Sequence, residues 1–493
     1  MSAATPATST GPGTGRGGRH GWWPLAVIAS AHLMAILDTT VMFVALPSAQ
    51  HALGMSASQR QWVVTAYTLA LAGLLLPGGR LADRLGARRT LIAGVAGFAV
   101  ASAVGGAAVT GAMLIAARAV QGAFGAVLIS STKSLLVSVY TDEDERTRAI
   151  SVFTATLTAG FAAGLVLGGV LTTALGWRWC LYVNVALSAL PLIAAPRVLH
   201  QLPARRTVTI DVASAVLATA GMAGLVYGLG EAASYGWGSA PVTLSLAVGV
   251  VALGWFTARQ AGHNGRLLPL RVVLGRNRGL GLIGLVVNSL STFGMMLILT
   301  YQLQSVMHYS ALRTGLALIP FGVAAALGSA VLAPALTRQV PPRWLVSGSI
   351  IAEAAGLLPL AWLTPGSGYL PLILAATLIE GLSTGVAGPV TLALSLRGVL
   401  PADTGAAGAA TSATSQFGSS IGAALLNTIA ASAAAGYTAA HAAGAASPAT
   451  LATAATVHGF TVAMIWGAGI LAAAAIPVAL FINAPKPARG QTR

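Results

Sequence analysis

Charged residues are scarce in this chain. They make up 8% of its 493 residues, whereas a soluble globular protein carries roughly 25%. The mean hydropathy is +0.79, and the apolar runs between charges repeatedly exceed the roughly 18–20 residues that span a bilayer as a helix. The scarcity of charge therefore excludes a soluble globular domain and predicts an all-α polytopic membrane protein.

Acidic residues and cysteine are rarer still. Only 11 Asp and Glu accompany 27 Lys and Arg, which gives a net charge of +16. The single cysteine, Cys180, excludes an intramolecular disulfide framework. The sequence also lacks a His-Glu-x-x-His zinc motif and a Gly-x-x-x-x-Gly-Lys-Ser/Thr nucleotide loop. These absences argue against an intramembrane metalloenzyme and an ATP-driven pump, so we expect no enzyme activity, cofactor or metal.

Apolar segments long enough to span a membrane number about fourteen. We expect them at 23–47, 61–79, 90–110, 112–135, 149–175, 180–198, 212–231, 241–259, 279–303, 315–336, 344–363, 369–391, 406–430 and 458–482. They divide as six, two and six. This predicts a disordered cytoplasmic tail (1–21), an N-terminal six-helix bundle (22–200), a two-helix insert (201–260), a cytoplasmic linker (261–278), a C-terminal six-helix bundle (279–484) and a second cytoplasmic tail (485–493).

The positions of the basic residues predict the orientation in the membrane. With a cytoplasmic N-terminus, 23 of the 27 basic residues face the cytoplasm, three (Arg60, Arg178 and Arg313) face outward, and Arg118 lies within a span. The positive-inside rule therefore places both termini in the cytoplasm. Because topology accounts for the positive charge, we expect no nucleic-acid partner.

The most charged short segment runs from Gly79 to Arg89, between the second and third apolar runs. It reads Gly-Arg-Leu-Ala-Asp-Arg-Leu-Gly-Ala-Arg-Arg. Gly79 and Gly86 allow a positive φ or a close approach of helices, and Asp83 is able to cap a helix or pair with a nearby arginine. A topological anchor would explain the arginines but not an aspartate between two spaced glycines.

This segment resembles the cytoplasmic turn between spans 2 and 3 of the major facilitator superfamily, Gly-x-Leu-Ala-Asp-Arg-x-Gly-Arg-Arg. Only Ala87 departs, where the family usually has a basic residue. The resemblance implies a major facilitator fold that alternates between inward- and outward-facing states. It also implies that the turn latches the two halves together on the cytoplasmic face. The latch residues would be Gly79, Asp83, Arg84, Gly86 and Arg88.

Other segments resemble the fourteen-span drug:proton antiporters of that superfamily. They are Leu37–Val41, Gln61–Tyr67, Arg118–Gly122 and Gly176–Trp179 with Asn184. The fifth-span antiporter motif keeps its glycines at Gly160, Gly164, Gly168 and Gly169, whereas Leu165 stands at the usual proline position. The small-residue face for close helix packing is therefore kept, but the residue that would kink the helix is missing.

Four ionisable residues lie well inside the expected spans: Asp38, Arg118, Glu353 and Glu380. A charge at the membrane centre costs roughly 2.5–3.5 kcal/mol on insertion scales, so these residues are candidates for proton coupling or substrate binding, with a structural ion pair as the alternative. Asp38 and Arg118 lie about 12 Å and 9 Å from the outer ends of their spans. We therefore expect them to meet in one cavity, while Glu353 and Glu380 would bind a cationic substrate or carry a second proton.

Two further basic side chains lie within spans. His32 precedes Asp38 by six residues, and we favour a packing role for it over a proton relay. Lys133 lies near the cytoplasmic end of its span, and its ammonium group is expected to reach the membrane interface along its apolar stem.

The resemblance implies a proton-coupled exporter of drugs or antibiotics in the bacterial plasma membrane. Its partners would be a small drug-like molecule, protons and the lipid bilayer, and we expect a monomer. Burial favours a neutral carboxyl group and a nearby arginine favours the carboxylate, so a substrate that changes this balance would release a proton. A permease of the same superfamily for another metabolite, such as a peptide, an amino acid or a siderophore, is the alternative.

Overall fold

The computed structural model describes residues 22–140, 142–199, 211–262, 268, 270–399, 404–442 and 447–483. These residues form helices joined by short connections, and the described ranges contain no strand. A bilayer core offers no water to backbone N–H and C=O groups, and a helix pairs all of them within one segment. The predicted tails, 1–21 and 485–493, lie outside the described residues.

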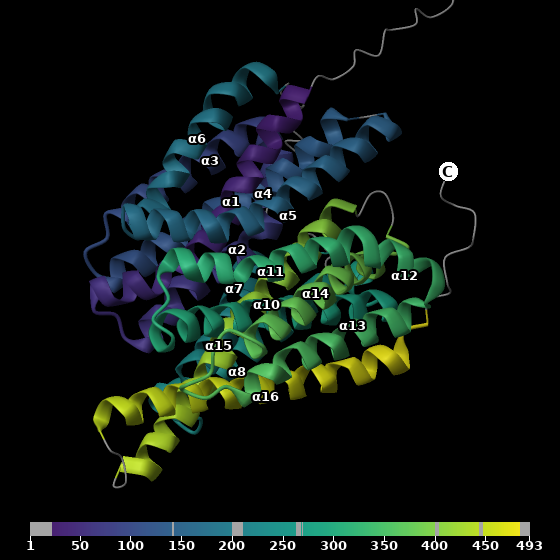
Figure 1. Ribbon diagram of the computed structural model, residues 1–493. Helices are drawn as coiled ribbons and strands as arrows, with labels where there is room; N and C mark the ends of the chain where they lie inside the picture. Colours follow the sequence, from purple (N-terminus) through teal and green to yellow (C-terminus); the bar gives the residue numbers. More distant parts are fainter. Residues whose placement is uncertain are drawn as a thin grey trace, which may run out of the picture.

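The helices follow one another along the described residues (Figure 1). They are α1 (Trp22–Leu53), α2 (Ala57–Leu85), α3 (Ala87–Gly106), α4 (Gly111–Val139), α5 (Glu143–Ala174), α6 (Trp179–Val198), α7 (Val212–Tyr235), α8 (Ala240–Gly262), α9 (Leu270–Val273), α10 (Arg276–Tyr301), α11 (Ala311–Leu327), α12 (Ala333–Gln339), α13 (Pro342–Leu357), α14 (Leu372–Leu396), α15 (Thr404–His441) and α16 (Pro448–Phe481). Among the described residues, thirteen helical segments are long and apolar enough to cross a membrane, and α5 adds the shorter apolar stretch Ala159–Ala174. The predicted all-α polytopic architecture is confirmed.

Two predicted boundaries differ from the structure. Helix α15 continues to His441 and α16 begins at Pro448, well beyond the predicted 406–430 and before the predicted 458–482. Alanine, the strongest helix former, is the commonest of the added residues, and the side chain of Ser447 caps the start of α16. The predicted linker 261–278 contains the short helix α9 and the first turn of α10.

Contacts gather the helices into two groups (Figure 1). In the first helix group, α1 to α6, helix α1 packs on α5 and α6 while α4 packs on α2 and α3. In the second helix group, α10 to α16, helix α15 packs on α10 and α16 while α13 packs on α14 and α16. The groups meet where α2 contacts α15 and where α5 contacts α11. Helices α7 and α8 pack on each other, and α7 also contacts α2 and α15.

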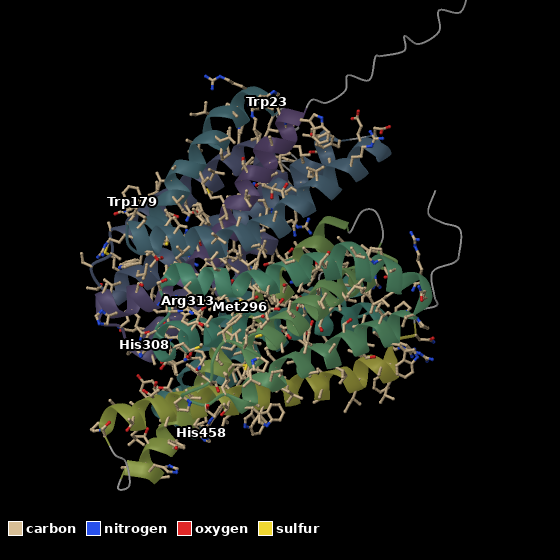
Figure 2. The ribbon with its side chains drawn as sticks, in the orientation of Figure 1. Trp23, Trp179, Met296, His308, Arg313 and His458 are labelled. Carbon is tan, nitrogen blue, oxygen red and sulfur yellow. The ribbon has the colours of Figure 1, made fainter. Side chains whose placement is uncertain are left out.

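The two ends of the bundle are named after the ends of α1, as the Trp22 end and the Leu53 end. Trp22 and Trp23 are 67% and 68% exposed at the first, and Trp179 is 48% exposed at the second. Figure 2 shows Trp23 near one end, and Trp179, His308 and Arg313 towards the other. Exposed tryptophans at helix ends are typical of the two interfaces of a membrane, where amphipathic rings are favoured.

Helix α5 approaches its neighbours closely through its glycines. A Cβ atom at Gly160, Gly164 or Gly168 would lie 2.9 Å or less from an atom of α1. On its other side, a Cβ at Gly169 would lie 2.7 Å from the Cα of Leu312 in α11. The helix is continuous through Leu165, whose side chain is fully buried. The glycine positions thus allow α5 to touch both helix groups, as small residues do between membrane helices.

We predict that Gly169→Ala destabilises the junction between α5 and α11. The new methyl group would overlap the α11 backbone, and overpacking of this kind costs about 1–3 kcal/mol. Thermal unfolding of the purified protein in detergent would measure the loss. The matched control is Gly254→Ala in α8, where a Cβ would meet no atom within 4 Å. An equal effect of the two substitutions would contradict this account of the junction.

Candidate functional site

Asp38 of α1 and Arg118 of α4 form a buried ion pair. The distance from Arg118 Nη1 to Asp38 Oδ2 is 2.5 Å, and each residue is 1% exposed. The sequence placed the two residues at similar depths in separate spans, and the structure brings them into contact. Each charge is therefore neutralised where the surroundings give it little solvation.

A set of polar side chains surrounds this ion pair. Gln121 Nε2 and Asn184 Nδ2 each donate to Asp38 Oδ1 at 2.7 Å, and Arg118 Nε donates to the Val63 carbonyl at 3.2 Å. A buried ion pair avoids a large net cost only when such hydrogen bonds satisfy its remaining atoms. The network joins α1 to α2, α4 and α6, so Asp38 lies at a junction of the first helix group.

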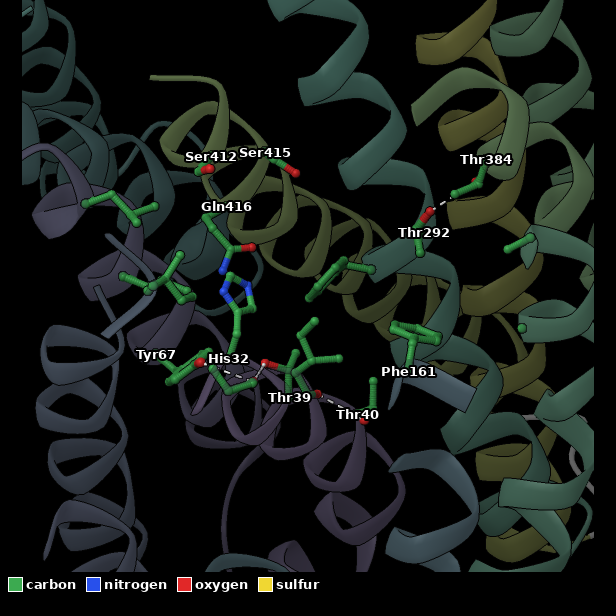
Figure 3. A pocket seen from close by; sticks show the side chains of 18 of the residues that line it. His32, Thr39, Thr40, Tyr67, Phe161, Thr292, Thr384, Ser412, Ser415 and Gln416 are labelled. Carbon is green, nitrogen blue, oxygen red and sulfur yellow. Dashed lines mark hydrogen bonds between the residues drawn. The ribbon is translucent and has the colours of Figure 1, made fainter. Parts of the chain in front are cut away.

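A central cavity of about 450 Å³ lies between the two helix groups (Figure 3). That volume falls within the range of small-molecule sites in proteins. Figure 3 shows His32, Thr39 and Tyr67 on one side, and Thr292 and Thr384 on the other. Both helix groups therefore contribute to its wall.

The ion pair does not line this cavity, contrary to the expectation from the sequence. Tyr67 lines the wall, and the guanidinium carbon of Arg118 lies 4.2 Å from the centre of its ring. Asp38 and Arg118 are both absent from the lining residues. The aromatic ring therefore separates the ion pair from the cavity, because spans at similar depth can meet without exposing their charges to the space between them.

The walls of the cavity combine aromatic and polar side chains. Phe161, Phe293 and Phe321 supply apolar surface. The ring centres of Phe161 in α5 and Phe321 in α11 are 5.8 Å apart. The polar lining includes hydroxyl groups and the amide of Gln416. These residues could not be ranked from the sequence alone, because aromatic side chains at helical spacing are common in any apolar core.

Lys133 is placed differently from the prediction. Its side chain lines the cavity, and its Nζ donates to Ser412 Oγ of α15, across the boundary between the helix groups. The ammonium group therefore points inward and not towards the membrane interface. His32 also lines the cavity, and its Nδ1 lies 2.9 Å from Thr132 Oγ1, the residue before Lys133.

Glu353 of α13 and Glu380 of α14 are fully buried in the second helix group. Asn288 Nδ2 donates to Glu353 Oε1 and Ser291 Oγ donates to Glu380 Oε1, both at 2.5 Å. The other carboxyl oxygen of each has no hydrogen-bond partner among the described residues. Asn288 and Ser291 lie one turn apart on one face of α10, so the same helix face holds both carboxyl groups.

The two glutamates also approach each other between α13 and α14. Gly356 lies three residues after Glu353, and a Cβ there would lie 3.1 Å from Glu380 Oε2. The next residues of α10, Thr292 and Phe293, line the central cavity. Helix α10 thus contacts the glutamates and the cavity at the same level of the bundle. Their polar partners on α10 were not predicted from the sequence.

The charged turn between α2 and α3 lies at the Trp22 end. Gly86 ends α2 with φ 91° and ψ 132°, a backbone conformation that favours glycine. Gly79 lies within α2 and has no atom within 4 Å of a Cβ position, so the expected reversal or close approach is wrong for Gly79. Asp83 and Arg84 are exposed. Arg88 Nη1 donates at 3.1 Å to the carbonyl of Leu199, which directly follows α6, so this contact stays within the first helix group.

Comparisons with known proteins agree on one family. Residues 28–424 match the model of the Major Facilitator Superfamily. A puromycin resistance protein of Streptomyces alboniger is 39% identical over 96% of this chain and 93% of its own length. A cephamycin export protein of Amycolatopsis lactamdurans is 38% identical over 82% of this chain and 84% of its own length.

A solved structure has the same fold. It is a bacterial homologue of the human lysosomal transporter Spinster, which matches with a TM-score of 0.64 at 17% identity and covers 93% of this chain and 96% of its own. Three findings agree: the described residues are helical, the two helix groups have a cavity between them, and the sequence matches the family over most of the chain. The chain is a multi-pass membrane protein and belongs to the major facilitator superfamily.

Proposed function

We propose that the protein is a proton-coupled exporter that carries drug-like or antibiotic molecules across the bacterial plasma membrane. The observation that carries this proposal is the central cavity between the two helix groups, with buried carboxyl groups in each group beside it. The names of the relatives, a puromycin resistance protein and a cephamycin export protein, support export of antibiotic-like molecules.

The proposal includes the topology that the sequence suggests. Both termini face the cytoplasm, so the Trp22 end is cytoplasmic and the Leu53 end is external. The chain divides into six-helix bundles over 22–200 and 279–484 with an insert over 201–260 between them, and it acts as a monomer without a nucleic-acid partner. The contacts of α7 with both α2 and α15 support a position for the insert beside the junction of the bundles.

Alternating access requires contacts between the helix groups that break and re-form. At the Leu53 end, Arg60 Nη2 of α2 donates to Asn427 Oδ1 of α15 at 2.5 Å. Gln61 of α2 accepts a hydrogen bond from the same Asn427 at 2.8 Å. These bonds and the α5–α11 packing would have to separate for the cavity to open outward. The polar contacts favour a junction that can part, because water replaces lost hydrogen bonds at little net cost.

Proton binding would act on the helix contacts through the buried carboxyl groups. A proton on Asp38 removes its attraction for Arg118 and weakens the link between α1 and α4. A single proton shared by Glu353 and Glu380 removes the repulsion between two buried negative charges. In both places the proton changes the attraction between helices. Such a change is required to couple proton entry to the switch between inward- and outward-facing states.

The alternative is a permease that takes up another metabolite, such as a peptide, an amino acid or a siderophore. The direction of transport separates it from the exporter. We predict that proteoliposomes containing the protein move an aromatic drug-like probe against its gradient when a pH gradient is imposed, and that a protonophore abolishes this movement. Transport that depends on ATP, or that runs only with the protons in the same direction, would contradict antiport.

We predict that Asp38→Asn abolishes uphill transport. The amide has no charge to gain or lose, so the link to Arg118 no longer responds to protons. The rate should fall at least about tenfold, which corresponds to a loss of roughly 1.4 kcal/mol in the driven step. Because the variant leaves Arg118 without its anion, size-exclusion and thermal unfolding profiles are needed as folding controls. A folded Asp38→Asn protein that still concentrates the probe would exclude Asp38 from coupling.

For the glutamates, we predict that Glu353→Gln and Glu380→Gln each reduce uphill transport and that the double variant is no worse than the more damaging single one. Two groups that share one proton act as a unit, so their effects are not additive. Transport by the three variants in proteoliposomes would measure this. The matched control is Glu231→Gln, another buried carboxyl, which accepts a hydrogen bond from Trp62 Nε1 at 2.8 Å. Strictly additive losses would contradict a shared proton.

The turn at the Trp22 end is proposed as the cytoplasmic latch, with Gly79, Asp83, Arg84, Gly86 and Arg88 as its residues. Asp83→Asn should slow the transport cycle while membrane insertion stays intact, because the change removes one charge from an exposed turn and leaves the helices unaltered.

The two glycines of the latch provide a sharper comparison. We predict that Gly86→Ala lowers stability and transport, because an alanine at φ 91° costs about 1–3 kcal/mol. Gly79→Ala should leave both unchanged or slightly raise stability, because alanine favours the helix there. Thermal unfolding and export rates of the two variants would measure the difference. Equal sensitivity of both positions would contradict the assignment of the turn to Gly86.

A further inference from the structure

The central cavity has an unusual balance of charge. Two of its lining residues, His32 and Lys133, are basic, and none of its lining residues is acidic. Three carboxyl groups are buried at mid-membrane in the described spans, those of Asp38, Glu353 and Glu380. None of them lines the cavity. A guest in the cavity therefore meets a lysine directly, while it meets the carboxylates only through intervening side chains.

Lys133 has no anionic partner in the described ranges. The ion pairs found there join Asp38 to Arg118 and Asp211 to Arg259. The hydrogen-bond partner of Lys133 is the Ser412 hydroxyl, whose own proton is donated to the Gly408 carbonyl at 3.0 Å. An ammonium group has three N–H donors, so two remain for a guest. An anion that enters beside this ammonium group is attracted to it.

His32 fixes the shape of the wall next to this lysine. Thr132 Oγ1 donates to the Ile129 carbonyl at 2.8 Å, so the hydrogen bond between Thr132 and His32 is donated by His32 Nδ1. The imidazole ring also packs edge-on against Phe153, with 5.0 Å between the ring centres. Because the ring is held on both sides, Lys133 is the group in this wall that is available to neutralise an anion.

The apolar lining residues of the cavity suit an aromatic or alicyclic body. Phe161 and Phe293 come from different helix groups, and Phe321 lies beside Phe161. The hydroxyl groups of Thr292 and Thr384 are 3.2 Å apart on the same wall and offer neutral polar contacts (Figure 3). A guest of the right class is thus amphipathic, with one charged end and one apolar end.

We infer that the central cavity selects amphipathic aromatic molecules that carry a carboxylate or a similar anionic group, with the anion bound at Lys133 and Ser412 and the apolar body against Phe161, Phe293 and Phe321. This inference rests on the proposed export function and names its substrate class. Cationic drugs are disfavoured, because Lys133 repels them and no carboxylate reaches the cavity. Lys133 belongs to the first helix group and Ser412 to the second, so an anion that binds to both touches both helix groups at once.

Binding to the full-length protein in detergent tests this inference without any gradient. The probes are anthracene-9-carboxylate, its methyl ester, and the trimethylammoniomethyl derivative of anthracene. The carboxylate should bind more tightly than the cation, and Lys133→Met should weaken carboxylate binding about tenfold, as loss of a charge-assisted hydrogen bond does. The same variant should leave binding of the ester within about twofold, because the ester lacks the charge.

Two control variants separate charge recognition from packing. Lys133→Arg keeps the charge and should retain most carboxylate binding. Arg313→Met removes a positive charge at the Leu53 end, where Arg313 lies over the Tyr309 ring, and should leave all three affinities unchanged. Equal weakening of acid and ester in Lys133→Met, or preference of the wild-type protein for the cation, would overturn the inference.

Binding and export measured together distinguish failure of the anionic substrate class from failure of proton-coupled export. If the carboxylate binds as expected but no probe is exported under a pH gradient, the substrate class stands and proton-coupled export is wrong. If cationic probes are exported under the gradient and the carboxylate neither binds nor is exported, export stands and the assignment of anionic substrates is wrong.

Discussion

The cost of an unpaired charge in an apolar interior governs most of what is observed in this protein. The chain carries few charges, and among the described residues specific hydrogen bonds hold those that are buried. Asp38 and Arg118 neutralise each other, and both oxygens of Asp38 accept hydrogen bonds from side chains of α4 and α6. Glu353 and Glu380 instead lie beside each other, with one bonded oxygen each. The first arrangement is satisfied as an ion pair, and in the proposed cycle a proton completes the second.

This contrast gives the two helix groups different roles in the proposed cycle. In the first group, a proton would break an existing attraction between helices. In the second, a proton would relieve an existing repulsion. Both changes act on helices that line or adjoin the central cavity, because Tyr67 contacts Arg118 on one side and α10 contacts the glutamates on the other. The close α5–α11 packing at Gly169 is one of the junctions between the groups that would separate in this cycle.

The sequence predicted the helices well because the membrane imposes a simple rule on length and polarity. The buried charges were found for the same reason, since an ionisable residue within an apolar span is conspicuous. What the sequence could not predict is which side chains face one another. Lys133 was expected at the interface because it lies near a span end, yet α15 offers Ser412 as a partner inside the bundle. Gly79 and Gly86 looked equivalent, and only the backbone geometry separates them.

The central claim is that drug movement and proton movement are obligatorily linked. The most direct measurement follows the internal pH of proteoliposomes that are loaded with a transported probe and diluted into probe-free buffer, with no pH gradient imposed at the start. Antiport predicts that the probe leaves while protons enter, so that the lumen becomes acidic, and that Asp38→Asn eliminates the acidification. Probe efflux through the wild-type protein with no change in internal pH would contradict the account.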